Sequence, residues 1–60
     1  MIKIGDLVEW ELRGRKKWLA IVIGESFNSL GTPISLVHWV TGRYAGQEDY
    51  IHSKDLETIA

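Results

Sequence analysis

The sequence predicts an all-β domain, a small barrel of five short antiparallel strands with one helical turn before the last strand. Residues 7–12, 18–26 and 34–40 are rich in β-branched and aromatic types, and turn-forming residues separate them. With 60 residues, the chain can build one small hydrophobic core. We therefore expect a single domain over residues 1–60.

The first of these segments has the alternation of a strand with one buried face. Val8, Trp10 and Leu12 alternate with Glu9 and Glu11, which is a period of two. The apolar side chains should face the core and the carboxylates should face water. Residues 13–17, with one glycine among four cations, then predict a hairpin turn to the second strand.

The second segment is apolar on both of its alternating faces. One face carries Trp18, Ala20 and Val22, and the other carries Leu19, Ile21 and Ile23. A strand of this kind is expected in the middle of a sheet and covered on both sides. Covering the second face requires a long neighbouring strand, a bend or a partner. Gly24 predicts such a bend, because sheets turn corners at glycines and bulges.

The remaining elements follow from shorter signals. Residues 27–33 form the longest predicted connection, and their single proline is expected in the loop. Residues 50–51 indicate a fourth strand. Residues 53–56 can make one helical turn with Ser53 as its N-cap, and residues 57–59 can close the sheet as a fifth strand.

Charge and composition exclude several classes of protein. Seven Lys and Arg against eight Asp and Glu give a net charge of −1, which argues against a protein that mainly coats nucleic acid or anionic lipid. There is no cysteine for a disulfide or a thiolate metal site. Residues 1–6 lack the apolar run of a signal peptide, and the apolar run 18–23 is too short to span a bilayer. We expect a soluble cytoplasmic protein with no membrane partner.

The polar residues form no recognisable catalytic motif. None of the serines has a base at an informative spacing, so we expect no enzyme activity and no cofactor. His38 and His52 would reach comparable depth if the third and fourth strands folded back around residues 43–45. Without a third ligand, we favour histidines that bond backbone groups, and we predict no metal site.

Four short motifs carry a resemblance to a known group of folds. They are Gly5-Asp6-Leu7-Val8, Trp18-Leu19-Ala20-Ile21-Val22, Val37-His38-Trp39, and Tyr50-Ile51-His52 followed by Asp55-Leu56 and Ile59. In this order they resemble the SH3-like barrel group, which includes Tudor, PWWP and KOW modules and small barrels encoded by tailed bacteriophages. The resemblance implies an SH3-like barrel with a helical turn before its last strand.

The resemblance also implies a place for a ligand. Tudor-like members bind ligands among aromatic side chains near the first hairpin and the loop between the third and fourth strands. By that analogy Trp18, Trp39 and Tyr44 are expected to contact a partner, with Phe27 and Trp10 as further candidates. The alternative is that Trp10 and Trp39 fill the core while Trp18 packs at its rim.

The predicted function is that of a non-enzymatic binding or adaptor module. We expect a small phage-type accessory protein that engages a host or viral protein in the host cytoplasm, through an aromatic and charged surface. One alternative is nucleic-acid binding through the basic first hairpin, whose cations are Arg13, Arg15, Lys16 and Lys17. Another is a structural homo-oligomer that buries the second apolar face of residues 18–23.

Overall fold

Five antiparallel strands and one 3-10 turn make up the fold, in a computed structural model that describes residues 2–12, 14 and 16–59, apart from the side chains of 12 and 16. The elements are β1 (Leu7–Leu12), β2 (Lys16–Phe27), β3 (Pro33–Trp39), β4 (Glu48–His52), η1 (Ser53–Asp55) and β5 (Leu56–Thr58). The all-β prediction, with a helical turn before the last of five strands, is confirmed. No helix in the described part of the chain is long and apolar enough to cross a membrane.

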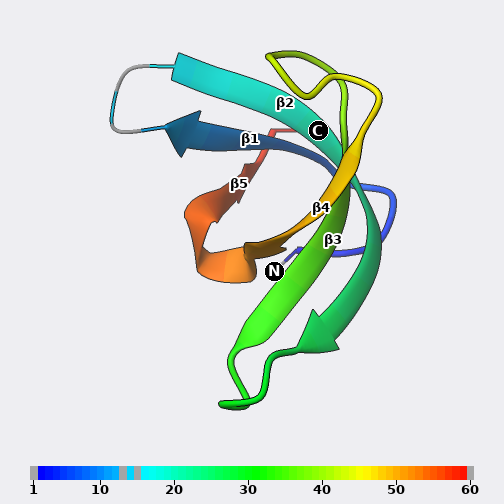
Figure 1. Cartoon of the computed structure of the whole chain (residues 1–60), viewed down its shortest axis with the longest axis vertical. Coiled ribbons are helices and arrows are strands. Elements are labelled where there is room, and N and C mark those ends of the chain that lie inside the picture. Colours follow the sequence, from blue (N-terminus) through cyan, green and yellow to red (C-terminus); the bar gives the residue numbers. More distant parts are fainter. Residues whose placement is uncertain (1, 13, 15, 60) are drawn as a thin grey trace.

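The strands lie in one sheet in the order β4-β3-β2-β1-β5, and all neighbours are antiparallel. The sheet is strongly curved, so that η1 and β5 come across its concave side (Figure 1). In the described ladder, β4 and β5 are the two edges and do not pair with each other. The sheet therefore curls around a core without closing into a barrel.

The length and bend of β2 produce this curvature. β2 has twelve residues, and its pairing with β3 shifts register between Val22 and Gly24. Gly24 lies under Leu36, whose Cβ is 3.4 Å from where a Cβ on Gly24 would stand. The bend predicted at Gly24 is confirmed as a bulge, which turns one half of the strand toward β1 and the other half toward β3 (Figure 1).

The core lies on the concave face of the sheet. Its buried apolar residues are Val8, Ala20, Val22, Val37, Trp39 and Leu56. Trp10 and Trp18 are half-buried and pack against this core. The predicted alternation is confirmed at Val8 in β1 and at Ala20 and Val22 in β2. The expectation that β2 is covered on both sides is wrong, because Ile23 is exposed. Of the two tryptophans that the alternative assigned to the core, Trp39 is buried and Trp10 is half-buried.

The helical turn is held by a serine pair that the sequence did not predict. His52 occupies the N-cap position without a side-chain bond, so the expectation that Ser53 is the N-cap is wrong. The Ser53 Oγ lies 2.7 Å from the Ser35 Oγ, which is fully buried. A buried hydroxyl needs a partner, and Ser53 supplies it by turning inward instead of capping the turn.

The pairing of β3 with β4 also differs from expectation. His38 lies opposite Glu48, and its Nδ1 is 3.4 Å from the Glu48 Oε2. His52 lies opposite Ile34, four residues further along β3, which is about 13 Å away in an extended strand. The histidines are therefore not at comparable depth. In the described residues, no group of three or more potential ligands is placed to hold a metal.

At the free edge of β4, one backbone donor is already occupied. Trp39 N–H donates to Gln47 O, so Trp39 and Gln47 form a hydrogen-bonded pair. Hydrogen-bonded and non-hydrogen-bonded pairs alternate along an antiparallel ladder, so Leu36 and Tyr50, three pairs further on, have no mutual hydrogen bonds. The N–H of Tyr50 then points away from β3, and it donates to the Asp49 Oδ1 at 2.8 Å.

The serine pair gives a stability prediction. We expect Ser53→Ala to lower the free energy of unfolding by about 1–3 kcal/mol, because it leaves the buried Ser35 hydroxyl without a partner. Ser35→Ala should cost less, because Ser53 is only half-buried and its free hydroxyl can reach water. The measurement is urea unfolding followed by tryptophan fluorescence. The double variant should resemble Ser35→Ala alone, and a larger loss for Ser35→Ala than for Ser53→Ala would contradict this account.

Candidate functional site

Four aromatic rings from three strands and one loop meet at one end of the sheet. This aromatic cluster consists of Trp10 on β1, Trp18 on β2, Trp39 on β3 and Tyr44 in the loop between β3 and β4. Trp10 and Trp18 are directly opposite in the β1–β2 register, while Ala20 opposite Trp39 leaves room for the third indole. The ladder therefore brings together rings that are far apart in sequence.

The three indoles are in mutual contact. Trp10 lies 5.6 Å from Trp18 and 5.4 Å from Trp39, centroid to centroid, and Trp18 meets Trp39 edge to face at 5.7 Å. Rings at these separations touch, and each pair adds about 0.5–1.5 kcal/mol beyond the burial of its area. The indoles fill the space between them, so they form a packed cluster and not an open cage.

Burial divides the cluster into a base and a surface. Trp39 is 2% exposed, and its Nε1 is buried without a hydrogen-bond partner. Tyr44 is 43% exposed and contacts the Trp18 ring edge to face, with centroids 5.6 Å apart. Trp39 is thus a supporting residue, whereas solvent or a partner can reach the exposed Tyr44 and the half-buried Trp18 and Trp10.

Hydrogen bonds hold the loop that carries Tyr44. Leu19 N–H donates to the Thr41 Oγ1 at 2.9 Å, and Val40 N–H donates to Leu19 O at 2.8 Å. Within the loop, Gln47 N–H donates to Tyr44 O at 2.9 Å. These bonds fix the loop against the start of β2, beside Trp18.

Gly42 lets the loop approach the Trp18 indole. Its φ is +92°, a left-handed conformation that L side chains rarely adopt, and a Cβ there would stand 2.7 Å from the Trp18 Cγ and Cε2. Sequence reasoning did not identify Gly42 or Thr41 as parts of the site. A threonine and a glycine directly after a strand were the available signal, but they are also typical of ordinary turns.

The basic first hairpin is only partly described. Arg13 and Arg15 lie outside the described residues, and so does the side chain of Lys16. The Lys17 Nζ is 3.5 Å from the Glu9 Oε1. The carboxylate of Glu9 therefore offsets part of the positive charge at the base of this hairpin, and the nucleic-acid alternative stays a prediction.

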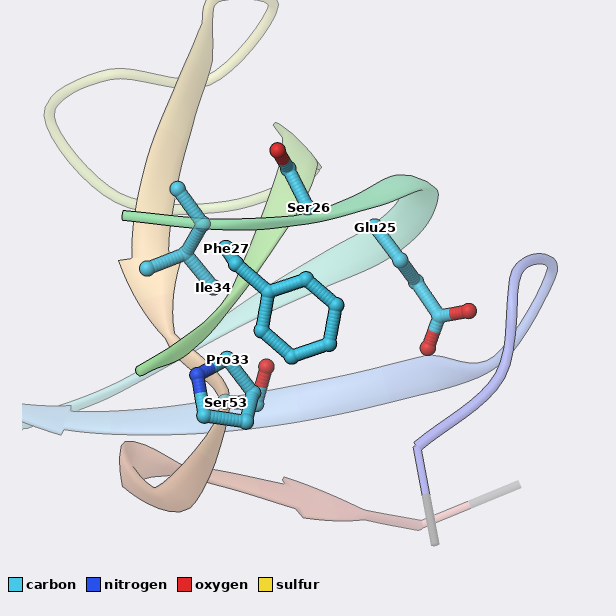
Figure 2. Close-up of a pocket in the computed structure, with 6 residues that line it drawn as sticks. All are labelled: Glu25, Ser26, Phe27, Pro33, Ile34 and Ser53. Atoms are coloured by element: carbon cyan, nitrogen blue, oxygen red, sulfur yellow. The ribbon is translucent and has the colours of Figure 1, made fainter. Parts of the chain in front are cut away.

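Phe27 lies apart from the aromatic cluster. It is the last residue of β2, whereas Trp18 is near its start, and it is 69% exposed. Figure 2 shows its ring between Glu25 and Ile34, with Pro33 and Ser53 nearby. These residues and Ser26 line a shallow hollow of about 430 Å³. The four residues predicted to bind a partner therefore occupy two separate places: Trp18, Trp39 and Tyr44 meet in the aromatic cluster, and Phe27 lies at the other end of β2.

No protein-family model, no curated protein and no solved structure matches the chain.

Two glycines of the β3–β4 loop make a matched pair for testing the contact with Trp18. Gly42 and Gly46 have φ values of +92° and +88°, so alanine is strained at both, but a Cβ on Gly46 would meet nothing within 4 Å. We expect Gly42→Ala to lower the free energy of unfolding by at least about 1 kcal/mol more than Gly46→Ala, because only the former clashes with the indole. Near-ultraviolet circular dichroism of the tryptophans should change in Gly42→Ala alone. Equal losses and equal spectra would show that the loop does not press on Trp18.

Proposed function

We propose that this protein is a non-enzymatic binding module that engages a protein partner through the surface formed by Trp18 and Tyr44. The observation that carries the proposal is the contact between the half-buried ring of Trp18 and the exposed ring of Tyr44. Hydrogen bonds to β2 fix the loop that carries Tyr44. Large aromatic side chains that are already immobilised lose little entropy on binding, and they dominate many protein interfaces.

The supporting layer beneath the pair favours recognition over a purely structural role for it. The buried Trp39 contacts Trp18 from the core, and Trp10 contacts it from the neighbouring strand, so the position of Trp18 does not depend on Tyr44 alone. A rigid aromatic anchor of this type suits an apolar or aromatic side chain of a partner protein.

The finer identity of the module is part of the same proposal. We propose an SH3-like fold and a small phage-type accessory protein that acts on a host or viral protein in the host cytoplasm. The order of five antiparallel strands with a 3-10 turn before the last supports the SH3-like assignment. The phage assignment rests on the resemblance of the sequence motifs.

A pair of alanine variants tests the proposal. Tyr44→Ala removes the exposed ring, and Leu30→Ala removes an apolar side chain that is 87% exposed in the loop between β2 and β3. The tagged protein would be used to capture partners from a lysate of its source cells after nuclease treatment. We expect a protein that wild type and Leu30→Ala retain, and that Tyr44→Ala loses by at least about tenfold.

Two outcomes would contradict the proposal. If folded Tyr44→Ala captures the same proteins as wild type, the Trp18–Tyr44 surface is not the binding site. If capture depends on nucleic acid and disappears with nuclease, the basic hairpin becomes the better candidate. Binding to DNA or RNA should then weaken steeply as salt is raised.

A further inference from the structure

The convex face of the sheet, opposite the core, is also apolar. Side chains alternate between the faces of a strand, and the residues on either side of Ile21 and of Leu36 are fully buried in the core, so these two point outward. The same alternation applies along β1 and β4. We call this surface the outer face, and its apolar members are Leu7, Leu19, Ile21, Ile34, Leu36 and Tyr50.

Four of these side chains form two short apolar rows across the strands. Leu7 lies opposite Ile21, whose other neighbour is His38, and Leu36 lies opposite Tyr50. Tyr50 is 55% exposed, and the other apolar members are half-buried. An antiparallel sheet with a core on one side normally presents polar side chains on the other. The outer face therefore has the composition of a surface that packs against a second layer.

Carboxylates border the apolar rows on both sides. Glu57 on β5 lies opposite Glu9 on β1, and Glu11 follows two residues further on the same side of β1. Glu48 on β4 lies at the other border, beside His38. Among the described side chains of this face, one lysine stands against these four carboxylates. It is Lys17, which contacts Glu9. The borders of the outer face are thus acidic.

We propose that the outer face binds an amphipathic α-helix of a partner protein, with an apolar stripe flanked by Lys and Arg. The apolar rows on β2 and β3 lie between acidic borders on β1 and β4, which are three strand spacings or about 14 Å apart. A helix with its side chains is about 10–12 Å across. A helix along β2 and β3 would therefore cover the apolar rows and place its flanking cations over the carboxylates.

The same charges argue against a second copy of this chain as the occupant. A two-fold pairing would place one outer face against another and bring the glutamates of both copies into one interface. Carboxylates of two copies that face each other in one interface repel. In the described residues the only helical element is the three-residue η1, so none of these residues supplies the helix that we propose for this face.

This surface is separate from the Trp18–Tyr44 site, and its test is independent of it. The probe is a synthetic helical peptide of about 18 residues, or five turns, with leucines at i, i+3, i+4 and i+7 and lysines beside them. One control peptide carries glutamates in place of the lysines, and another has the lysine peptide's composition in scrambled order. Binding to the full chain is measured by NMR titration of the backbone amides.

We expect the lysine peptide to bind at least about tenfold more tightly than either control, with the largest shifts in β2, β3 and β4. Tyr50→Thr and Ile21→Thr keep a strand-forming residue and should each weaken binding at least about fivefold. Glu48→Lys combined with Glu57→Lys should remove the preference for the lysine peptide. Tyr44→Ala, at the other site, should bind as the wild type does.

Any of four results from the peptide titration would overturn the proposal. They are equal binding of the lysine and glutamate peptides, equal binding of the scrambled peptide, unchanged affinity in folded Tyr50→Thr and Ile21→Thr, and shifts centred on Trp18 and Tyr44. A dimer in sedimentation equilibrium that Tyr50→Thr dissociates would also overturn it, because a second copy would then be the occupant.

Discussion

The rest of the structure depends on the bend in β2. This strand pairs with β1 over residues 16–21 and with β3 over residues 20–27, and its register with β3 shifts at the bulge between Val22 and Gly24. Because the sheet turns there, Ala20 and Val22 face a concave space that Trp39 and Leu56 can fill. A straight β2 would leave these side chains on an open sheet with nothing to pack against.

The curvature also explains why the two faces of β2 have different environments although their compositions are similar. The concave face can be covered by the chain itself, since η1 and β5 return across it (Figure 1). The described residues form a single sheet and one 3-10 turn, and none of them makes a second layer over the convex face. Local periodicity shows that both faces are apolar, but it does not show which of them the chain covers.

The sequence predicted the elements better than their connections. The alternation of β1 gave its bounds, whereas β2 begins two residues earlier and β3 one residue earlier than predicted. A proline can begin β3 because its position in the ladder needs no N–H. Asn28 N–H donates to Thr32 O, so the next pair in the alternating ladder, Phe27 and Pro33, has no mutual hydrogen bonds. The inward turn of Ser53 depends on the buried hydroxyl of Ser35, which lies 18 residues away in sequence.

The candidate site was predictable by residue type but not by arrangement. The resemblance to Tudor-like modules implied that Trp18, Trp39 and Tyr44 contact a partner. That Trp39 is buried follows from its position opposite Ala20, which only the long-range register determines. The close approach of Gly42 to Trp18 depends on the bonds that anchor the loop to Leu19, and no local pattern encodes them.

The occupied donor at the edge of β4 affects how this protein can assemble with others. An exposed strand can template the addition of further strands, and this growth has no natural end, as in fibrils. Asp49 holds the outward N–H of Tyr50 and places a negative charge on that edge, so an incoming strand would have to displace a carboxylate to reach this donor. Strand addition is therefore disfavoured at the middle of β4.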